Sequence, residues 1–214
     1  MKIRNKVWAN KLTPIINSYK GELRELANRS GCIPNEYQWF NAFERCSYNK
    51  LKVVIIGSDP YPDVSDANGV AFSVSRDYKL PKTLNNIFKS LKIDLGIENT
   101  NGNLNKWANQ GVLLLNSSLT TEKGLSGGHS NVWQPVVEDI IKVLNRKRLP
   151  LVWSLWGNQA KSLEGLIVSE SDVILKHVHP SPRVKHNEFV FSKPFSKINQ
   201  ALVDLGYEEI DWST

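Results

Sequence analysis

The chain has 214 residues, 41% of them hydrophobic, which is enough for one large domain over residues 1–214 with a sheet covered by helices on both sides. Its 27 lysine and arginine residues against 21 aspartate and glutamate residues give a formal charge of +6, which favours a polyanionic partner, nucleic acid first. The 2 cysteines are too few for an iron–sulfur cluster or a four-thiolate zinc site. No membrane-spanning run or secretory signal is visible, so we expect no membrane association and a cytoplasmic location, or a nuclear one in a eukaryote or an infected host cell.

Helical and strand patterns alternate along most of the chain. Apolar residues at helical spacing predict a helix over 7–29, interrupted near Pro14, and a second helical stretch that begins at Ile33-Pro34. Further helices are predicted at 83–96, 104–109, 132–146, 158–168 and 194–205. Short apolar runs predict strands at 52–56, 111–115, 151–156 and 172–177. This alternation predicts an α/β fold with three layers, α/β/α, around a central, mainly parallel, four-stranded sheet.

A polar or glycine-rich segment follows each predicted strand. Asp59 follows the first strand, Asn116 the second, Gly157 and Asn158 the third, and His179 the fourth. The carboxyl ends of parallel strands meet at one edge, where open α/β sheets bind ligands, so we expect these residues to converge on one site. Taken singly, each also fits an ordinary role, because Asp and Asn form turns and a lone histidine is more often a surface or core residue.

Several short segments carry the most specific pattern in the chain. They are GSDPY (57–61), GVAFSV (69–74), GVLLLN (111–116) and HPSP (179–182), with looser matches at LPKTL (80–84), LWGN (155–158) and FSKIN (195–199). In this order and spacing they resemble the signature segments of family 1 uracil-DNA glycosylases, from about residue 8 to the C-terminus. The resemblance implies a monofunctional enzyme, without metal or cofactor, that hydrolyses the bond between flipped-out uracil and deoxyribose and so begins base-excision repair of DNA.

The resemblance implies catalytic roles for Asp59 and His179. Departure of uracil leaves positive charge on the sugar and negative charge on the base. Asp59 would stabilise the cation and orient the attacking water, and a carboxylate about 5 Å from that cation contributes about 3 kcal/mol, roughly a hundredfold in rate. His179 would donate a hydrogen bond to uracil O2, where negative charge develops.

Other matching residues are implied to bind the base. Asn116 would accept from uracil N3–H and donate to O4, whereas cytosine presents the reverse pattern. Phe72 would stack on the flipped base, although without the resemblance it fits a core aromatic on a strand. Tyr61 would exclude the methyl group of thymine, and Ser58 would border the same pocket.

Small polar loops are implied to hold the DNA backbone, because backbone N–H groups and hydroxyls suit phosphate contacts. The residues concerned are Pro81, Thr83, Gly157, Asn158, Ser181 and Arg183. We expect the partner to be uracil-containing DNA, single- or double-stranded, and the protein to be a monomer. Binding of a proteinaceous inhibitor is a further expectation from the resemblance.

The chain departs from the family at four positions. Ser58 stands where most members carry Gln, and Pro62 where they carry His, although poxviral members also have Pro there. Asn158 replaces a usual Ser. Arg183 stands where the family places a Leu that enters the emptied base stack. A guanidinium can stack and pair with phosphates in its place, or it can fail to hold the duplex open. We therefore expect a stronger preference for single-stranded over duplex substrate than in typical family members.

Two alternatives follow from these departures. One is a DNA-binding replication or processivity scaffold on the same fold with weak excision, which Pro62 favours. The other is a glycosylase for another modified pyrimidine, which Ser58 and Pro62 favour because they border the pocket. The presence of Asp59, Asn116 and His179 favours uracil excision over a scaffold, since a scaffold needs no working pocket.

Overall fold

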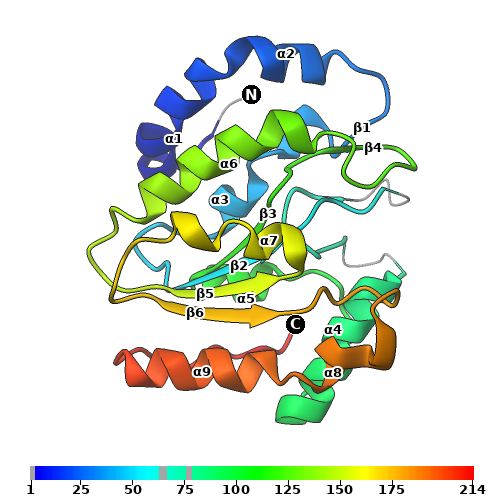
Figure 1. Ribbon diagram of the computed structural model, residues 1–214, viewed down its shortest axis with the longest axis vertical. Coiled ribbons are helices and arrows are strands. Elements are labelled where there is room, and N and C mark those ends of the chain that lie inside the picture. Colours follow the sequence, from blue (N-terminus) through cyan, green and yellow to red (C-terminus); the bar gives the residue numbers. More distant parts are fainter. Residues whose placement is uncertain (1–2, 63–66, 76–78) are drawn as a thin grey trace.

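A parallel four-stranded sheet forms the centre of the protein in a computed structural model that describes residues 3–62, 67–75 and 79–214 (Figure 1). Its strands, in the spatial order β3-β2-β5-β6, are Val112–Asn116 (β3), Val53–Gly57 (β2), Val152–Trp156 (β5) and Val173–His177 (β6). All three pairings are parallel. The predicted α/β fold with a four-stranded parallel sheet is therefore confirmed.

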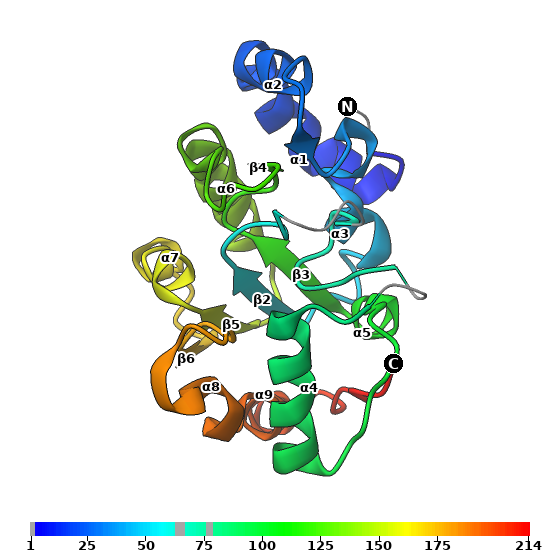
Figure 2. The ribbon, with the colours of Figure 1, turned by 90° about the vertical axis from the view of Figure 1, so that its right-hand side faces the viewer.

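Helices cover both faces of this sheet, as Figures 1 and 2 show. One face carries α1 (Lys6–Ser18), α2 (Lys20–Ala27), α3 (Asn41–Arg45), α6 (Ser130–Leu144) and α7 (Asn158–Lys161). The other carries α4 (Lys82–Leu95), α8 (Glu188–Phe191) and α9 (Pro194–Asp204), while α5 (Asn105–Asn109) packs beside β3. Side chains alternate along a strand, so Val54 and Ile56 pack into the core under α1 and α6. Val53 and Ile55 pack into the core on the opposite face, under α4 and α9. This double burial explains why the strands are apolar throughout.

The register of the sheet brings the ends of the strands together. Gly57 pairs with Asn116, and Trp156 pairs with His177. The segments that leave β2, β3, β5 and β6 therefore begin at one edge of the sheet. At this edge the N–H of Ser118 donates to the carbonyl of Ser58 (2.9 Å), so the loops after β2 and β3 are also tied to each other.

Three local predictions were wrong or incomplete, and two elements were not predicted. The first helix runs through Pro14 and ends at Ser18, because burial of Trp8 and Leu12 outweighs the hydrogen bond that proline cannot donate. The stretch predicted as helical from Ile33 instead begins with a two-residue strand, Cys32–Ile33 (β1), paired antiparallel with Thr121–Glu122 (β4). A 3-10 turn at Glu36–Gln38 (η1) then precedes α3, and the helix predicted over 158–168 is α7 followed by a second 3-10 turn, Glu164–Leu166 (η2). The sequence pattern did not predict a third 3-10 turn, Lys185–Asn187 (η3), or the short helix α8.

Among the described residues, no helix is long and apolar enough to cross a membrane.

His177, the last residue of β6, is buried as a neutral imidazole. Its Nδ1 lies 3.1 Å from Ser192 Oγ, and that hydroxyl donates to the Phe189 carbonyl, so Nδ1 must carry the proton. Nε2 has no partner among the described residues. Burial, with smaller contributions from Lys197 and Lys161, lowers the pKa of His177 to about 4.

We expect the free energy of unfolding to fall as the pH drops, because the unfolded chain binds a proton at His177 more readily than the folded chain. The loss begins near the ordinary histidine pKa of 6.5 and is complete near 4, which amounts to roughly 3 kcal/mol. Urea unfolding of the wild type and of His177→Gln, at about pH 7 and about pH 4.5, measures it. His177→Gln should lack this part of the pH dependence. An equal fall in the free energy of unfolding in both proteins would contradict the assignment of the effect to His177.

Candidate active site

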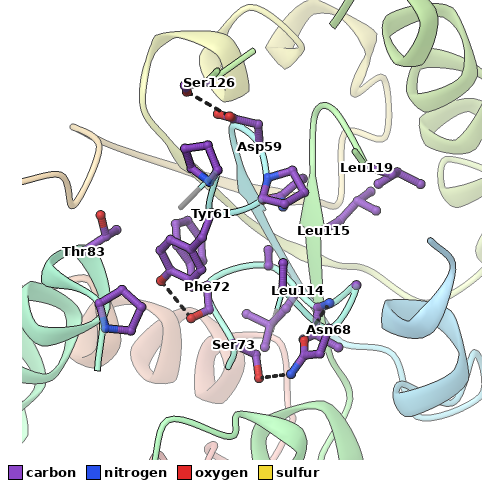
Figure 3. Close-up of a pocket in the computed structure, with 18 of the residues that line it drawn as sticks. Asp59, Tyr61, Asn68, Phe72, Ser73, Thr83, Leu114, Leu115, Leu119 and Ser126 are labelled. Atoms are coloured by element: carbon purple, nitrogen blue, oxygen red, sulfur yellow. Dashed lines mark hydrogen bonds between the residues drawn. The ribbon is translucent and has the colours of Figure 1, made fainter. Parts of the chain in front are cut away.

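A cavity of about 620 Å³ opens at the carboxyl edge of the sheet (Figure 3). It is lined by the loop after β2, residues 67–73, the start of α4 and the segment after β6. The structure brings these sequence-predicted residues to its wall: Asp59, Tyr61, Phe72, Pro81, Thr83, Asn116, His179, Ser181 and Arg183. Ser58, Gly157 and Asn158 do not line it. The apolar floor includes Leu114 and Leu115 of β3.

Asp59 projects from the loop after β2 and is fixed by a distant segment. Its Oδ2 accepts a hydrogen bond from Ser126 Oγ (2.8 Å, Figure 3). It accepts a second one from the backbone N–H of Gly127 (2.9 Å). Ser126 and Gly127 lie in the loop between β4 and α6. Sequence reasoning missed both, since a glycine- and serine-rich loop has no periodicity that points to a partner. An ionised carboxylate at the cavity wall can stabilise a neighbouring cation or orient a water molecule.

Phe72 takes a left-handed backbone conformation with φ of +64°. It lies outside any strand, so the strand in its alternative interpretation is wrong, but its ring is buried in the core on the α4 side of the sheet, as that interpretation expected. Tyr61 Oη donates to the Phe72 carbonyl (2.9 Å), and burial raises the pKa of Tyr61, which keeps that hydroxyl protonated. The Phe72 ring lies 5.1 Å from the Trp156 ring and 6.1 Å from the His179 ring, centroid to centroid. This turn presents an aromatic face to the cavity.

Asn116 ends β3 with its side chain in the cavity wall and 8% exposed. Its Oδ1 is buried and has no hydrogen-bond partner among the described residues. An unpaired buried acceptor costs about 1–3 kcal/mol, a cost that an N–H donor from a ligand removes.

Gly57 makes room for this arrangement. A Cβ at that position would lie 2.6 Å from Phe72 Cζ and 2.8 Å from Asn116 Oδ1. Only a residue without a side chain therefore allows the ring and the amide to stand next to each other.

His179 lines the cavity as a neutral imidazole. The backbone N–H of Ser181 donates to its Nδ1 (3.0 Å), so Nε2 carries the proton. Burial lowers the pKa of His179, and the nearby charge of Asp59 opposes that shift. Gly157 supports this residue from outside the cavity, since a Cβ there would lie 3.0 Å from His179 Cβ. Among the described residues of the cavity wall, Asp59 is thus the carboxylate and His179 a neutral N–H donor.

The rim of the cavity is formed by two short segments. Pro81 and Thr83 stand at the N-terminus of α4, where backbone N–H groups have no partner within the helix. On the other side, Ser181 Oγ accepts from the N–H of Arg183 (3.2 Å), and the Arg183 side chain is exposed. Among the described residues, no group of three or more His, Cys, Asp or Glu could hold a metal ion.

Comparison with known proteins identifies the family. The family model described as "Uracil DNA glycosylase superfamily" matches residues 43–203. The uracil-DNA glycosylase of Clostridium beijerinckii is 47% identical over 188 residues, 86% of this chain and 83% of that protein. That of Amoebophilus asiaticus is 45% identical over 181 residues, 84% of this chain and 82% of that protein.

Solved structures agree with the sequence comparisons. The crystal structure of mimivirus uracil-DNA glycosylase has a TM-score of 0.82 and 26% identity, and covers 94% of this chain and 87% of that chain. A mimivirus UNG variant in complex with UGI has a TM-score of 0.85 and 28% identity, and covers 94% of this chain and 83% of that chain. The chain with this cavity therefore belongs to the uracil-DNA glycosylase superfamily, resembles its family 1, and is a hydrolytic glycosylase that removes uracil in DNA repair.

Proposed function

We propose that Asp59 and His179 carry the chemistry of uracil removal in the cavity described above. The observation that best supports this proposal is that the Asp59 carboxylate and a neutral His179 imidazole line the same cavity. As the bond between uracil N1 and the sugar C1′ breaks, its electron pair moves onto the uracil ring. The sugar is left as a cation, to which a water molecule adds at C1′. The added water then gives up one proton to solvent, and the uracil anion takes up one proton, so that both products are neutral.

Asp59 would act on the sugar side of this reaction. Its charge stabilises the cation, and a water molecule bound to the carboxylate is oriented towards C1′. With Oδ2 occupied by Ser126 and Gly127, Oδ1 is the oxygen that has no hydrogen-bond partner among the described residues. We therefore assign the contact with water to Oδ1.

His179 would act on the base side. Its Nε2–H donates to uracil O2 as negative charge accumulates there, and a donor fixed before the reaction needs no reorganisation. The neutral form is favoured because burial lowers its pKa and because the Ser181 N–H already occupies Nδ1. An imidazolium would have to give up that backbone hydrogen bond.

Asn116, Phe72 and Tyr61 would select the base. The unpaired Oδ1 of Asn116 suits the N3–H of uracil, with Nδ2 facing O4; cytosine has an acceptor at N3 and a donor at C4. Phe72 supplies the stacking face. Tyr61, fixed by its bond to the Phe72 carbonyl, leaves no room beside C5 for a methyl group.

The rim would bind the DNA backbone. Thr83 on one side and Ser181 on the other have small hydroxyl side chains, and the backbone N–H groups of the first turn of α4, which begins after Pro81, have no partner within the helix; such donors suit phosphates. Gly157 and Asn158 are part of this proposal, although they lie outside the cavity wall.

Arg183 is expected to make the enzyme prefer single-stranded substrate. Extraction of a base from a duplex costs a few kcal/mol, and an exposed guanidinium fills the vacated stack less well than an apolar side chain. Single-turnover rates on matched oligonucleotides should be several-fold higher for the single strand, and Arg183→Leu should narrow the ratio. Equal rates of the wild-type enzyme on the two substrates would refute this prediction. Lys193→Leu is the control variant, because it also removes a positive charge.

The proposal extends to partners and location. The mimivirus complex with the inhibitor protein UGI supports binding of such an inhibitor by this chain. A cytoplasmic location is proposed because the curated relatives named above are bacterial proteins. We further propose that residues 1–214 act as one domain and as a monomer.

Release of free base from oligonucleotides with uracil, thymine, cytosine or 5-substituted uracils, with and without a chelator, tests this assignment. We expect release of uracil alone, at a rate that the chelator leaves unchanged. Faster release of a 5-substituted base would favour the modified-pyrimidine alternative. Tight DNA binding with negligible release would favour the scaffold.

A further inference from the structure

We propose that Ser126 is a positioning residue for the reaction and that it acts only through the Asp59 carboxylate. This inference rests on the catalytic role proposed above for Asp59. Ser126 lies 67 residues further along the chain and lines the same cavity. Its side chain is exposed, so the packing of the core does not depend on it.

The contact geometry fixes one oxygen of the carboxylate. Ser126 Oγ (Figure 3) and the Gly127 N–H both donate to Oδ2, at 2.8 and 2.9 Å respectively. The last torsion of an aspartate is broad, so a carboxylate without anchors samples a wide range of orientations. Two donors on one oxygen remove that freedom and keep Oδ1 available for water and for the sugar cation.

The loop that carries these donors is itself held in place. Thr121 Oγ1 donates to the Leu125 carbonyl, and Ser130 Oγ donates to the Gly127 carbonyl at 2.9 Å. Gly127 has φ of +74°, which a glycine adopts without strain. The hydroxyl of Ser126 is therefore presented to Asp59 by a preorganised turn.

A buried polar cluster anchors the end of this loop at the start of α6. Trp133 Nε1 donates to Thr120 Oγ1 (2.6 Å), and Thr120 Oγ1 lies 3.0 Å from His129 Nδ1. Because an indole N–H only donates, the threonine proton is free to reach His129. Thr120 and His129 are buried, and the pairing of β1 with β4 holds the other end of the loop. Ser126 thus connects a rigid framework to Asp59.

Ser126→Ala removes one of the two anchors, since the Gly127 N–H belongs to the backbone. We expect the single-turnover rate of uracil release to fall roughly three- to tenfold, with unchanged affinity for an uncleavable uracil oligonucleotide and an unchanged melting temperature. Ser126→Thr keeps the hydroxyl and should stay within about twofold of wild type. The matched control is Ser18→Ala, since Ser18 is exposed and, within the part of the chain that the structure describes, its hydroxyl bonds only to the Pro14 carbonyl.

The decisive test is the same substitution in an Asp59→Asn background. If Ser126 acts through the charge of Asp59, Ser126→Ala causes no further loss there. Two results would overturn the proposal for Ser126 and leave the role of Asp59 intact. One is an equal fall in the rate of uracil release in both backgrounds; the other is normal activity of Ser126→Ala while Asp59→Asn is inactive. Wild-type turnover by Asp59→Asn would overturn it together with the catalytic role of Asp59.

Discussion

Asp59→Asn is expected to lower the rate of uracil release about a hundredfold or more, because a charge about 5 Å from the sugar cation contributes about 3 kcal/mol at an effective dielectric near 20. Asparagine has the same shape, and its amide oxygen can still accept from Ser126 and Gly127. The substitution therefore removes the charge and little else. Single-turnover release from a uracil oligonucleotide measures the loss.

Two measurements accompany this prediction. The melting temperature and the affinity for uncleaved DNA should stay close to wild type, which separates a lost charge from a lost fold. A folded Asp59→Asn protein that turns over within a few-fold of wild type would show that the carboxylate does not stabilise the cation.

Gly57→Ala is expected to reduce uracil release by about a hundredfold or more. Its new methyl would lie 2.6 Å from Phe72 Cζ and 2.8 Å from Asn116 Oδ1, too close for either to stay in place. Displacement of both the stacking ring and the recognition amide removes base binding, and overpacking costs about 1–3 kcal/mol of stability. The ratio kcat/KM and the melting temperature together measure the two effects.

The chain offers a matched control for this change. Gly21 lies in α2, where an added Cβ meets nothing within 4 Å, so Gly21→Ala should leave activity unchanged and raise the stability of the helix slightly. Near-normal activity of a folded Gly57→Ala would mean that Phe72 and Asn116 do not need their present positions. The account of base recognition would then fail.

The parts of the fold that sequence predicts well are those with a strong local pattern. The strand of Val53–Gly57 is apolar at every position, and its burial on both faces follows from that pattern alone. Asp59, Asn116 and His179 could be grouped in advance because parallel strands place their carboxyl ends at one edge. Thus the location of the cavity was predictable from order and spacing.

The remaining features depend on contacts between distant segments. Ser126 reaches Asp59 across 67 residues, from a loop that has no periodicity. The two-residue pairing of Cys32–Ile33 with β4 is too short to leave an alternating pattern. The left-handed turn at Phe72 is fixed by its contact with Tyr61, not by its own sequence preference. In each case tertiary structure supplies what local sequence lacks.

The most direct test of the proposed site is a crystal structure of the Asp59→Asn protein with a single-stranded uracil oligonucleotide. We predict that the uracil lies in the cavity, stacked on Phe72, with the Asn116 amide facing N3 and O4 and His179 Nε2 within hydrogen-bond distance of O2. An oligonucleotide bound elsewhere, or a uracil in the cavity without these contacts, would contradict the account.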